Sequence, residues 1–160
     1  IVTLADELQH IRYYANVLQL RSETLRTSFR VDEQQAHTVA CVRLTMQPLI
    51  ENAFRHGYEK KGLDPDWIEV VGERVDNYYT VRVIDHGAGM APEQIQLYNH
   101  AFALPAIPSG EVMPRLPGVG LWNVHRRIRL TFGEQYGLMI EDNRQHGFVI
   151  QVRLPLSEKQ

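Results

Sequence analysis

The first 25 residues carry a stripe of positions at alternating spacings of four and three. The stripe is apolar apart from one serine and consists of Leu4, Leu8, Ile11, Ala15, Leu18, Ser22 and Leu25. This heptad spacing predicts a bundle or coiled-coil helix. The positions between are largely polar, so we expect a partner helix in a segment outside this sequence. The alternative is an amphipathic helix that packs on its own domain, because the stripe has only the minimum length for a coiled coil.

Alternating apolar and polar residues predict two strands, at 67–75 and 78–85, joined by the polar turn Asp76-Asn77. A two-residue turn of this kind suits a tight antiparallel hairpin. Shorter strand-like pieces lie at 28–31, 138–141 and 148–154, and the last two flank a turn at 142–147. The pattern therefore predicts a sheet built largely from antiparallel neighbours.

Two more helices are predicted, each with one core face. The first covers about 44–59, and the second follows the glycines at 118 and 120 and stops at Gly133. The core-facing residues are Met46, Leu49, Ile50 and Ala53 in the first helix and Leu121, Val124, Ile128 and Phe132 in the second. This order of elements, without regular alternation of strand and helix, predicts an α+β fold: a two-layer α/β sandwich with helices on one face of a mixed, largely antiparallel sheet, preceded by the N-terminal bundle helix.

The stretch 91–117 contains five prolines, at positions 92, 105, 108, 114 and 117. Only its first part, 92–102, can form a helix, because proline breaks a helix interior. Loops longer than about 12 to 15 residues are usually functional lids or disordered segments. We interpret 91–117 as a lid.

Composition narrows the classes of function. The 160 residues fit one domain, and 17 basic against 19 acidic residues give a formal charge of −2, which argues against nucleic-acid binding through bulk charge. The single cysteine, Cys41, excludes an internal disulfide framework and fits a cytoplasmic location. No apolar run approaches the roughly 20 residues that span a bilayer. Because the chain opens on Ile1, we expect an excised fragment, with any membrane segment outside it.

The first group of candidate site residues lies on the predicted helix 44–59. On a helical wheel, Asn52 and His56 fall together at the border of the apolar stripe, and Arg55 lies further toward solvent. An asparagine oxygen suits Mg²⁺ whose other ligands are phosphate oxygens and waters, and Arg55 can meet a phosphate. The alternative is a local hydrogen bond for Asn52 and an ordinary pair of Glu51 with Arg55.

The second group is Asp85-His86-Gly87-Ala88-Gly89-Met90, directly after a strand. A carboxylate that ends a buried row can accept a hydrogen bond from the exocyclic amine of adenine, and two glycines let the backbone approach a flat base. The alternative is a plain turn at the end of a strand.

The third group is Pro117-Gly118-Val119-Gly120-Leu121, which opens a helix. Glycines there expose backbone N–H groups and the positive end of the helix dipole, a natural site for phosphate. The alternative is a glycine-rich helix entry without a ligand. The basic residues Arg126, Arg127 and Arg129 further along this helix are interpreted as a solvated face, with Arg127 as a possible exception, and the seven histidines show no metal-binding spacing.

Together, in this order and around a lid, the three groups resemble the N, G1 and G2 boxes of the GHKL ATPase superfamily. Segments 47–57, 118–128 and 4–14 are more closely similar to sensor histidine kinases of the LytS/YesM type. The resemblance implies the Bergerat sandwich, with 1–27 as the end of a dimerisation and phosphoacceptor region and 28–160 as the catalytic ATP-binding domain.

The resemblance also implies roles for individual residues. Asn52 would ligate Mg²⁺ and Asp85 would bind adenine. In the transfer of the γ-phosphoryl group, Glu51 is a candidate polariser of the acceptor histidine, although its helical-wheel angle differs from that of Asn52 by about 100°. The remaining ATP contacts implied are Arg55, His56, Gly87, Gly89, Met90, Gly118, Val119, Gly120 and Leu121.

Partners follow from the same resemblance: ATP, a response regulator, and a second copy joined through the missing helical region, with no nucleic acid. The chain would be the cytoplasmic domain of a membrane-anchored sensor. The phosphoacceptor of such kinases lies in a segment resembling Pro-His-Phe, which His10 does not match. We therefore expect ATP binding without autophosphorylation by this piece alone.

Two other classes of function compete. Mechanical ATPases of the gyrase or MutL kind usually carry a general-base glutamate four residues before the N-box asparagine, where this chain has Pro48. A non-catalytic scaffold is expected only if the nucleotide pocket is blocked.

Overall fold

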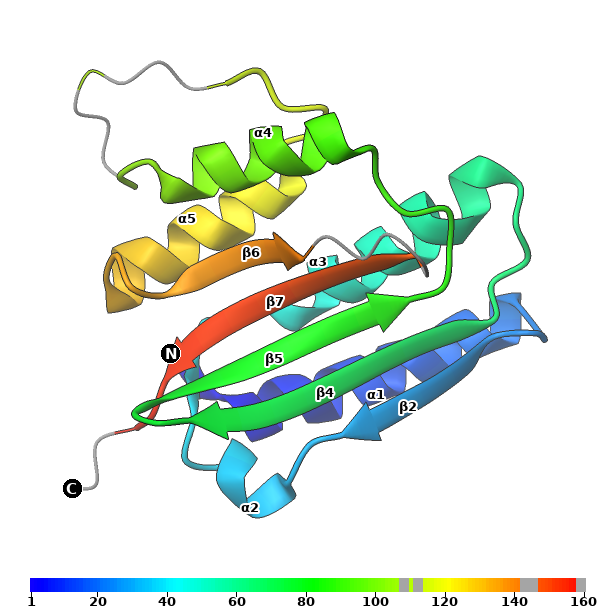
Figure 1. The fold of residues 1–160 in the computed structure, drawn as a ribbon. Coiled ribbons are helices and arrows are strands. Elements are labelled where there is room, and N and C mark those ends of the chain that lie inside the picture. Colours follow the sequence, from blue (N-terminus) through cyan, green and yellow to red (C-terminus); the bar gives the residue numbers. More distant parts are fainter. Residues whose placement is uncertain (107–109, 111–113, 142–146, 158–160) are drawn as a thin grey trace.

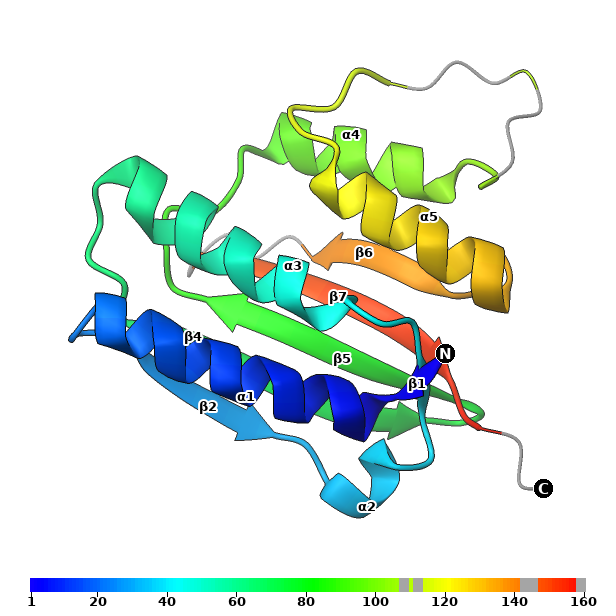
Figure 2. The ribbon, with the colours of Figure 1, turned by 180° about the vertical axis from the view of Figure 1, so that it is seen from behind.

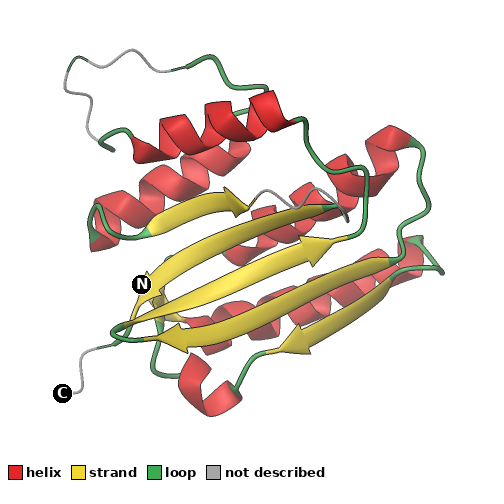
Figure 3. Cartoon of the chain, in the orientation of Figure 1, coloured by secondary structure: helices red, strands yellow, loops and turns green. Residues whose placement is uncertain are grey.

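The main feature of the fold is a five-stranded sheet in the order β2-β4-β5-β7-β6 (Figure 1, Figure 3). It is seen in a computed structural model that describes residues 1–106, 110, 114–141 and 147–157. The strands are β2 (Arg26–Arg30), β4 (Trp67–Val75), β5 (Tyr78–Asp85), β6 (Gly137–Glu141) and β7 (Phe148–Pro155). β2 runs parallel to β4, and the other neighbouring pairs are antiparallel. The predicted mixed, largely antiparallel sheet is confirmed.

Three helices lie side by side over one face of this sheet: α1 (Leu4–Arg21), α3 (Met46–Asn52) and α5 (Gly120–Phe132) (Figure 2). A fourth helix, α4 (Pro92–Ala103), lies at the β6 edge, where the Asn99 side-chain amide bonds both backbone polar groups of Ile140. The N-terminal half also contains α2 (Glu33–Ala36) and a short pairing of β1 (Val2–Thr3) with β3 (Ala40–Cys41). The core therefore fills one side of the sheet, as a two-layer α+β sandwich requires.

The apolar stripe of α1 is buried within the domain itself. Its buried members Leu4, Leu8, Ile11, Ala15 and Leu18 are each at most 2% exposed, and most belong to the same core cluster as α3 and the sheet. A capping box of Thr3 and Asp6 begins the helix. Of the two alternatives for this stripe, the structure thus shows the amphipathic helix that packs on its own domain. The assignment of 1–27 to a dimerisation region stays a prediction.

The hairpin of β4 and β5 has the predicted two-residue turn, because Val75 pairs with Tyr78. The predicted helix 44–59 is instead made of three pieces. α3 continues as a π-helix, η1 (Ala53–Tyr58), and then as a 3-10 turn, η2 (Glu59–Lys61), which ends at Gly62 with φ 66°. The helix therefore departs from regular α-helical geometry just after Asn52.

Parts of two predicted loops lie outside the described residues. These are 107–109 and 111–113 of the lid and 142–146 of the turn between β6 and β7. The helix predicted within the lid is confirmed as α4. In the portion of the chain that the structure describes, no helix is long and apolar enough to cross a bilayer.

Candidate functional site

The residues predicted to meet magnesium and phosphate lie where α3 passes into η1. Asn52 ends α3 and is half-buried, whereas Arg55 and His56 on η1 are exposed. Burial, together with the charges of Lys60 and Arg55, lowers the pKa of His56 from its ordinary 6.5. Single π-helical turns are often found at functional sites. All three side chains are accessible to a ligand.

Glu51 faces α1. Its carboxylate accepts a hydrogen bond of 3.0 Å from the hydroxyl of Tyr14. Burial and the bond to Glu51 raise the pKa of Tyr14 to about 12, so the phenol remains a donor at neutral pH. The sequence pattern did not single out Tyr14, because the contact depends on how α1 packs against α3. The predicted role of Glu51 in polarising a histidine stays a prediction.

The start of α3 is held from two sides. The buried carboxylate of Glu7 on α1 accepts hydrogen bonds from the backbone N–H groups of Leu44 (2.7 Å) and Met46 (3.1 Å). Arg127 on α5 donates to the carbonyl oxygens of Arg43 (2.9 Å) and Leu44 (2.8 Å). Leu44 has a left-handed φ of 62°, a conformation that is costly for leucine and needs such support. Arg127, the suspected exception in the basic cluster, therefore binds protein backbone.

Asp85 ends β5 as a buried carboxylate, only 1% exposed. Burial raises its pKa from 3.8 to about 6, although hydrogen bonds from the backbone of Gly87 and Phe148 oppose that rise. The Gly87 N–H donates to the Asp85 carboxylate at 2.8 Å. Such a carboxylate is suited to a ligand that donates a hydrogen bond in a pocket shielded from water.

The glycines after Asp85 have different structural reasons. Gly89 adopts a φ of 73°, which favours glycine, whereas a Cβ at Gly87 would lie 2.2 Å from the carbonyl oxygen of Gly57 on η1. A Cβ at Gly57 would in turn lie 3.2 Å from the Asp85 carboxylate. Gly87 is therefore required by close packing of protein backbone. The sequence interpretation invoked a sharp turn and the approach of a flat base, and it missed the contact with Gly57.

The third predicted group opens α5. Gly118, Val119 and Gly120 are all exposed, and none has a left-handed φ. Apart from its chain neighbours and the backbone of its own helix, no described atom lies within 4 Å of the place where a Gly120 Cβ would stand. The first N–H groups of a helix lack partners within the helix, so this end can receive phosphate oxygens. Leu121, the next residue, is buried in the core.

The three groups come together at one end of the sandwich. In Figure 2 the η1 end of the α3 segment and the loop after β5 lie at the left, and the start of α5 is the end of that helix nearer to them. The hydroxyl of Tyr98 on α4 donates to the Gly118 carbonyl at 3.4 Å, which connects the start of α5 to α4. Met90, at the end of the loop after β5, is half-buried against the core. The geometry thus joins the separate motifs into one candidate nucleotide site.

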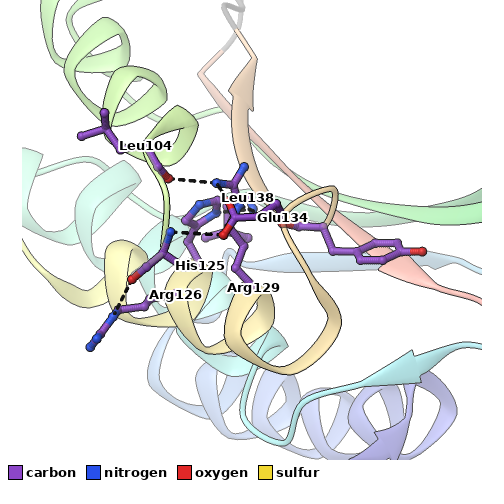
Figure 4. Close-up of polar contacts among 8 residues, drawn as sticks. Leu104, His125, Arg126, Arg129, Glu134 and Leu138 are labelled. Atoms are coloured by element: carbon purple, nitrogen blue, oxygen red, sulfur yellow. Dashed lines mark hydrogen bonds and ion pairs between the residues drawn. The ribbon is translucent and has the colours of Figure 1, made fainter. Parts of the chain in front are cut away.

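The lid residues that directly follow α4 are fixed to α5 (Figure 4). Arg129 donates to the Leu104 carbonyl at 2.9 Å and pairs with Glu134 at 3.0 Å, and Arg126 donates to the Ala106 carbonyl at 3.3 Å. The interpretation of this basic cluster as a solvated face is therefore wrong for Arg129, whose side chain is only 14% exposed, whereas Arg126 is exposed as predicted although it also bonds the lid backbone. Their acceptors come from a proline-containing loop whose path the sequence did not predict.

His125 lies beneath this contact and is only 1% exposed. Burial, and then the charge of Arg129, lowers its pKa to about 3, so the imidazole is neutral at physiological pH. Its Nδ1 accepts a hydrogen bond from the Leu138 N–H at 2.8 Å. Because Leu138 belongs to the edge strand β6, His125 satisfies a backbone group of that edge.

A cavity of about 390 Å³ lies here, at the opposite end of α5 from Gly118 and Gly120. The side chains of Asn99 and Arg129 line it, and both are already hydrogen-bonded to the protein. The lining also includes His125, whose Nε2 has no hydrogen-bond partner among the described residues, but none of the predicted site residues lines the cavity, so the nucleotide site remains the stronger candidate.

Solved catalytic domains of histidine kinases share this fold. The catalytic domain of histidine kinase ThkA matches with a TM-score of 0.63 over 98% of this chain and 97% of that chain, at 18% identity. The mycobacterial sensor histidine kinase MprB matches with a TM-score of 0.55 over 96% of each chain, at 14% identity. The fold is thus that of a histidine kinase catalytic domain, the class predicted from the motifs.

The chain belongs to the family of histidine kinase-, DNA gyrase B- and HSP90-like ATPases, whose sequence profile matches residues 39–158. It is 30% identical over 158 residues to the sensor histidine kinase YesM of Bacillus subtilis, covering 97% of this chain and 24% of YesM. It is 25% identical to the sensor protein kinase HptS of Staphylococcus aureus, covering 98% of this chain and 28% of HptS. The chain spans about a quarter of the length of these relatives, and the predicted kinship with sensor histidine kinases is confirmed.

Proposed function

We propose that this chain is the ATP-binding catalytic domain of a two-component sensor histidine kinase. It would present the γ-phosphoryl group of Mg-ATP to a histidine on a segment outside these 160 residues, for relay to a response regulator. The observation that carries the proposal is the buried Asp85 carboxylate, which lies against Gly57 on the π-helical turn that directly follows Asn52.

Adenine recognition is assigned to Asp85. An ionised carboxylate in a buried site discriminates for a base that donates a hydrogen bond, as the adenine amine does, and against guanine, which has a carbonyl at that position. Gly87, Gly89 and Met90 form the loop beside this carboxylate. Its fixed backbone would hold the base without reorganisation.

The phosphates are assigned to Gly118, Val119, Gly120 and Leu121 and to the exposed side chains Arg55 and His56. Free N–H groups and the helix dipole favour negative charge at the start of α5. Asn52 offers a neutral oxygen to Mg²⁺, which when bound would neutralise charge on the phosphate oxygens. Within the described residues no group of three or more His, Cys, Asp or Glu side chains could hold a metal, so the ion would depend on the nucleotide for most of its ligands.

Catalysis by this site would be mainly positioning, because phosphoryl transfer needs few covalent steps from the protein. Pro48 occupies the place where clamp ATPases carry a general base, which favours transfer to a protein over rapid hydrolysis. Glu51 is the proposed polariser of the acceptor imidazole. The Tyr14 hydroxyl would fix the orientation of its carboxylate.

The wider assembly is also a proposal. The outward face of α1 exposes three apolar side chains, Tyr13 (65%), Val17 (52%) and Leu20 (87%), which supports contact with a helical dimerisation region of the full-length protein. By analogy with sensor kinases, that protein would be anchored in the membrane with this domain in the cytoplasm.

Isothermal titration calorimetry with Mg-ATP tests the nucleotide site. We expect Asp85→Asn and Asn52→Ala each to weaken binding by about 10- to 100-fold, because each removes a charged or metal-linked contact. Asp76→Asn and Asn16→Ala are matched controls, since both residues are exposed and lie on other parts of the fold. Absence of binding to the unmodified chain, or equal binding by all variants, would refute the proposed function.

A further inference from the structure

The hydroxyl of Tyr58 joins three segments beside the candidate base pocket. Tyr58 ends η1, and only 2% of the residue is exposed. Its oxygen lies 2.9 Å from Asp66 Oδ1 and 2.6 Å from the carbonyl oxygen of Trp67, and it accepts a hydrogen bond of 2.8 Å from the N–H of His86. A phenol has one hydrogen to donate, so either of the two acceptors can receive it while the lone pair holds His86.

The residue that Tyr58 holds directly follows Asp85. Three successive N–H groups of this loop are all engaged: His86 donates to Tyr58, Gly87 to the Asp85 carboxylate at 2.8 Å, and Ala88 to the Gly57 carbonyl at 3.0 Å. Two of the three acceptors therefore come from the last two residues of η1. The orientation of the Asp85 carboxylate depends on this backbone path, since its own hydrogen bond is to the middle N–H.

The role of the Tyr58 hydroxyl can be tested separately from the packing of its ring. The Tyr58 ring belongs to the hydrophobic core, where phenylalanine would occupy the same volume. Burial raises the pKa of Tyr58 above its ordinary 10, so the group stays neutral in the working range of pH. The oxygen is thus a fixed polar anchor.

We propose that Tyr58 is a positioning residue for adenine recognition, whose hydroxyl fixes the loop 85–88 so that Asp85 faces the amine of the purine. The inference rests on the proposed function, because it presupposes that Asp85 binds adenine. Tyr58 acts through the loop and does not itself touch the base.

Calorimetric titrations of Mg-ATP and Mg-GTP into the unmodified chain, Tyr58→Phe and Tyr79→Phe test this role. Tyr79 is the matched control, because it is 0% exposed and its hydroxyl has no hydrogen-bond partner among the described residues. We expect Tyr58→Phe to weaken Mg-ATP binding by about 5- to 30-fold while Mg-GTP changes less, so that preference for adenine falls. Tyr79→Phe should leave the preference intact.

Amide hydrogen exchange measured by NMR provides a second readout. The His86 N–H should lose protection in Tyr58→Phe and keep it in Tyr79→Phe. If Tyr58→Phe retains the full preference for ATP, or weakens both nucleotides equally, the positioning role is wrong while the proposed function stands. If the unmodified chain binds no Mg-ATP, both fall together.

Discussion

At the scale of single residues, Asp85 combines two opposing requirements. A buried carboxylate is costly in its charged form, yet the charged form is the better acceptor for a ligand amine. The hydrogen bond from Gly87 offsets part of that cost, but the pKa still rises to about 6. Without a ligand, the ionised Asp85 carboxylate is therefore less stable in this buried site than a neutral group would be. A ligand that donates a hydrogen bond to it would offset part of the cost of burying the charge.

We predict that the pKa of Asp85, followed by carbon-13 NMR of its carboxyl group, is near 6 in the free chain and falls when Mg-ADP is added. The folded pKa exceeds the ordinary value, so the folded chain binds this proton more tightly than the unfolded chain does. Its contribution to stability is complete below about pH 4 and is lost as the pH rises through about 6, a change of about 3 kcal/mol.

The variant Asp85→Asn lacks the carboxyl group, so a comparison of spectra identifies the Asp85 resonance. The stability of this variant should lack the component of the pH dependence that comes from Asp85. Asp76→Asn, in the exposed hairpin turn, should keep it. A carboxyl resonance that titrates near pH 4 and does not respond to nucleotide would contradict the assignment.

Asp85 could be predicted as a site residue, whereas Tyr58 and Gly57 could not. Asp85 ends an alternating strand and precedes two glycines, so its place is visible in the local pattern. The contacts of Tyr58 join residues 66, 67 and 86, which only the packing of η1 against the sheet brings together. A tyrosine after a glycine carries no local signal for such a role.

At the scale of elements, α3 is held in position by its neighbours. Glu7 of α1 binds the N–H groups at its start, Arg127 of α5 binds the preceding carbonyls, and η1 at the other end packs against the loop after β5. Displacement of α1 would therefore be transmitted to the helix that carries Asn52.

Glu7→Gln tests the junction of α1 with α3. We expect the free energy of unfolding, measured with urea, to fall by about 1 to 3 kcal/mol, because the amide weakens two charged hydrogen bonds and brings a donor against backbone N–H groups. Glu23→Gln is the control, since Glu23 is exposed after the same helix. Equal effects of the two variants would show that the Glu7 carboxylate does not support α3.

The predicted helix 44–59 shows which features of a helix can be predicted from the spacing of its apolar residues. The apolar face of Met46, Leu49, Ile50 and Ala53 is buried as predicted. The transition to a π-turn after Asn52 was not predicted, because it places Gly57 against the Asp85 loop and so depends on a contact about 30 residues away in the chain.

At the scale of the whole molecule, α1 and the sandwich share one core. We predict that a chain shortened to residues 28–160 has no cooperative thermal transition by circular dichroism. It would lose five buried leucine and isoleucine side chains of the stripe, each worth about 1.5 to 3 kcal/mol, against a typical total stability of about 5 to 15 kcal/mol.

The chain of 160 residues with Leu20→Ser is the control, because Leu20 lies on the same helix but is 87% exposed. That variant should melt cooperatively, close to the unmodified chain. If residues 28–160 alone melt at the same temperature, α1 is a separate unit, and the predicted boundary near residue 27 is also a boundary of folding.

Local sequence patterns were enough to predict most of the elements and the three motifs. The local spacing of apolar residues shows which face of a strand or helix is apolar, and glycine and proline mark turns and the ends of helices. The hairpin, α4, α5 and the three site motifs could therefore be predicted from residues that are close in sequence. The packing partners of α1, the change of α3 to a π-turn, and the groups that hold Asp85 are instead set by tertiary packing. These outcomes depend on contacts between distant segments, whose free energies no local pattern contains.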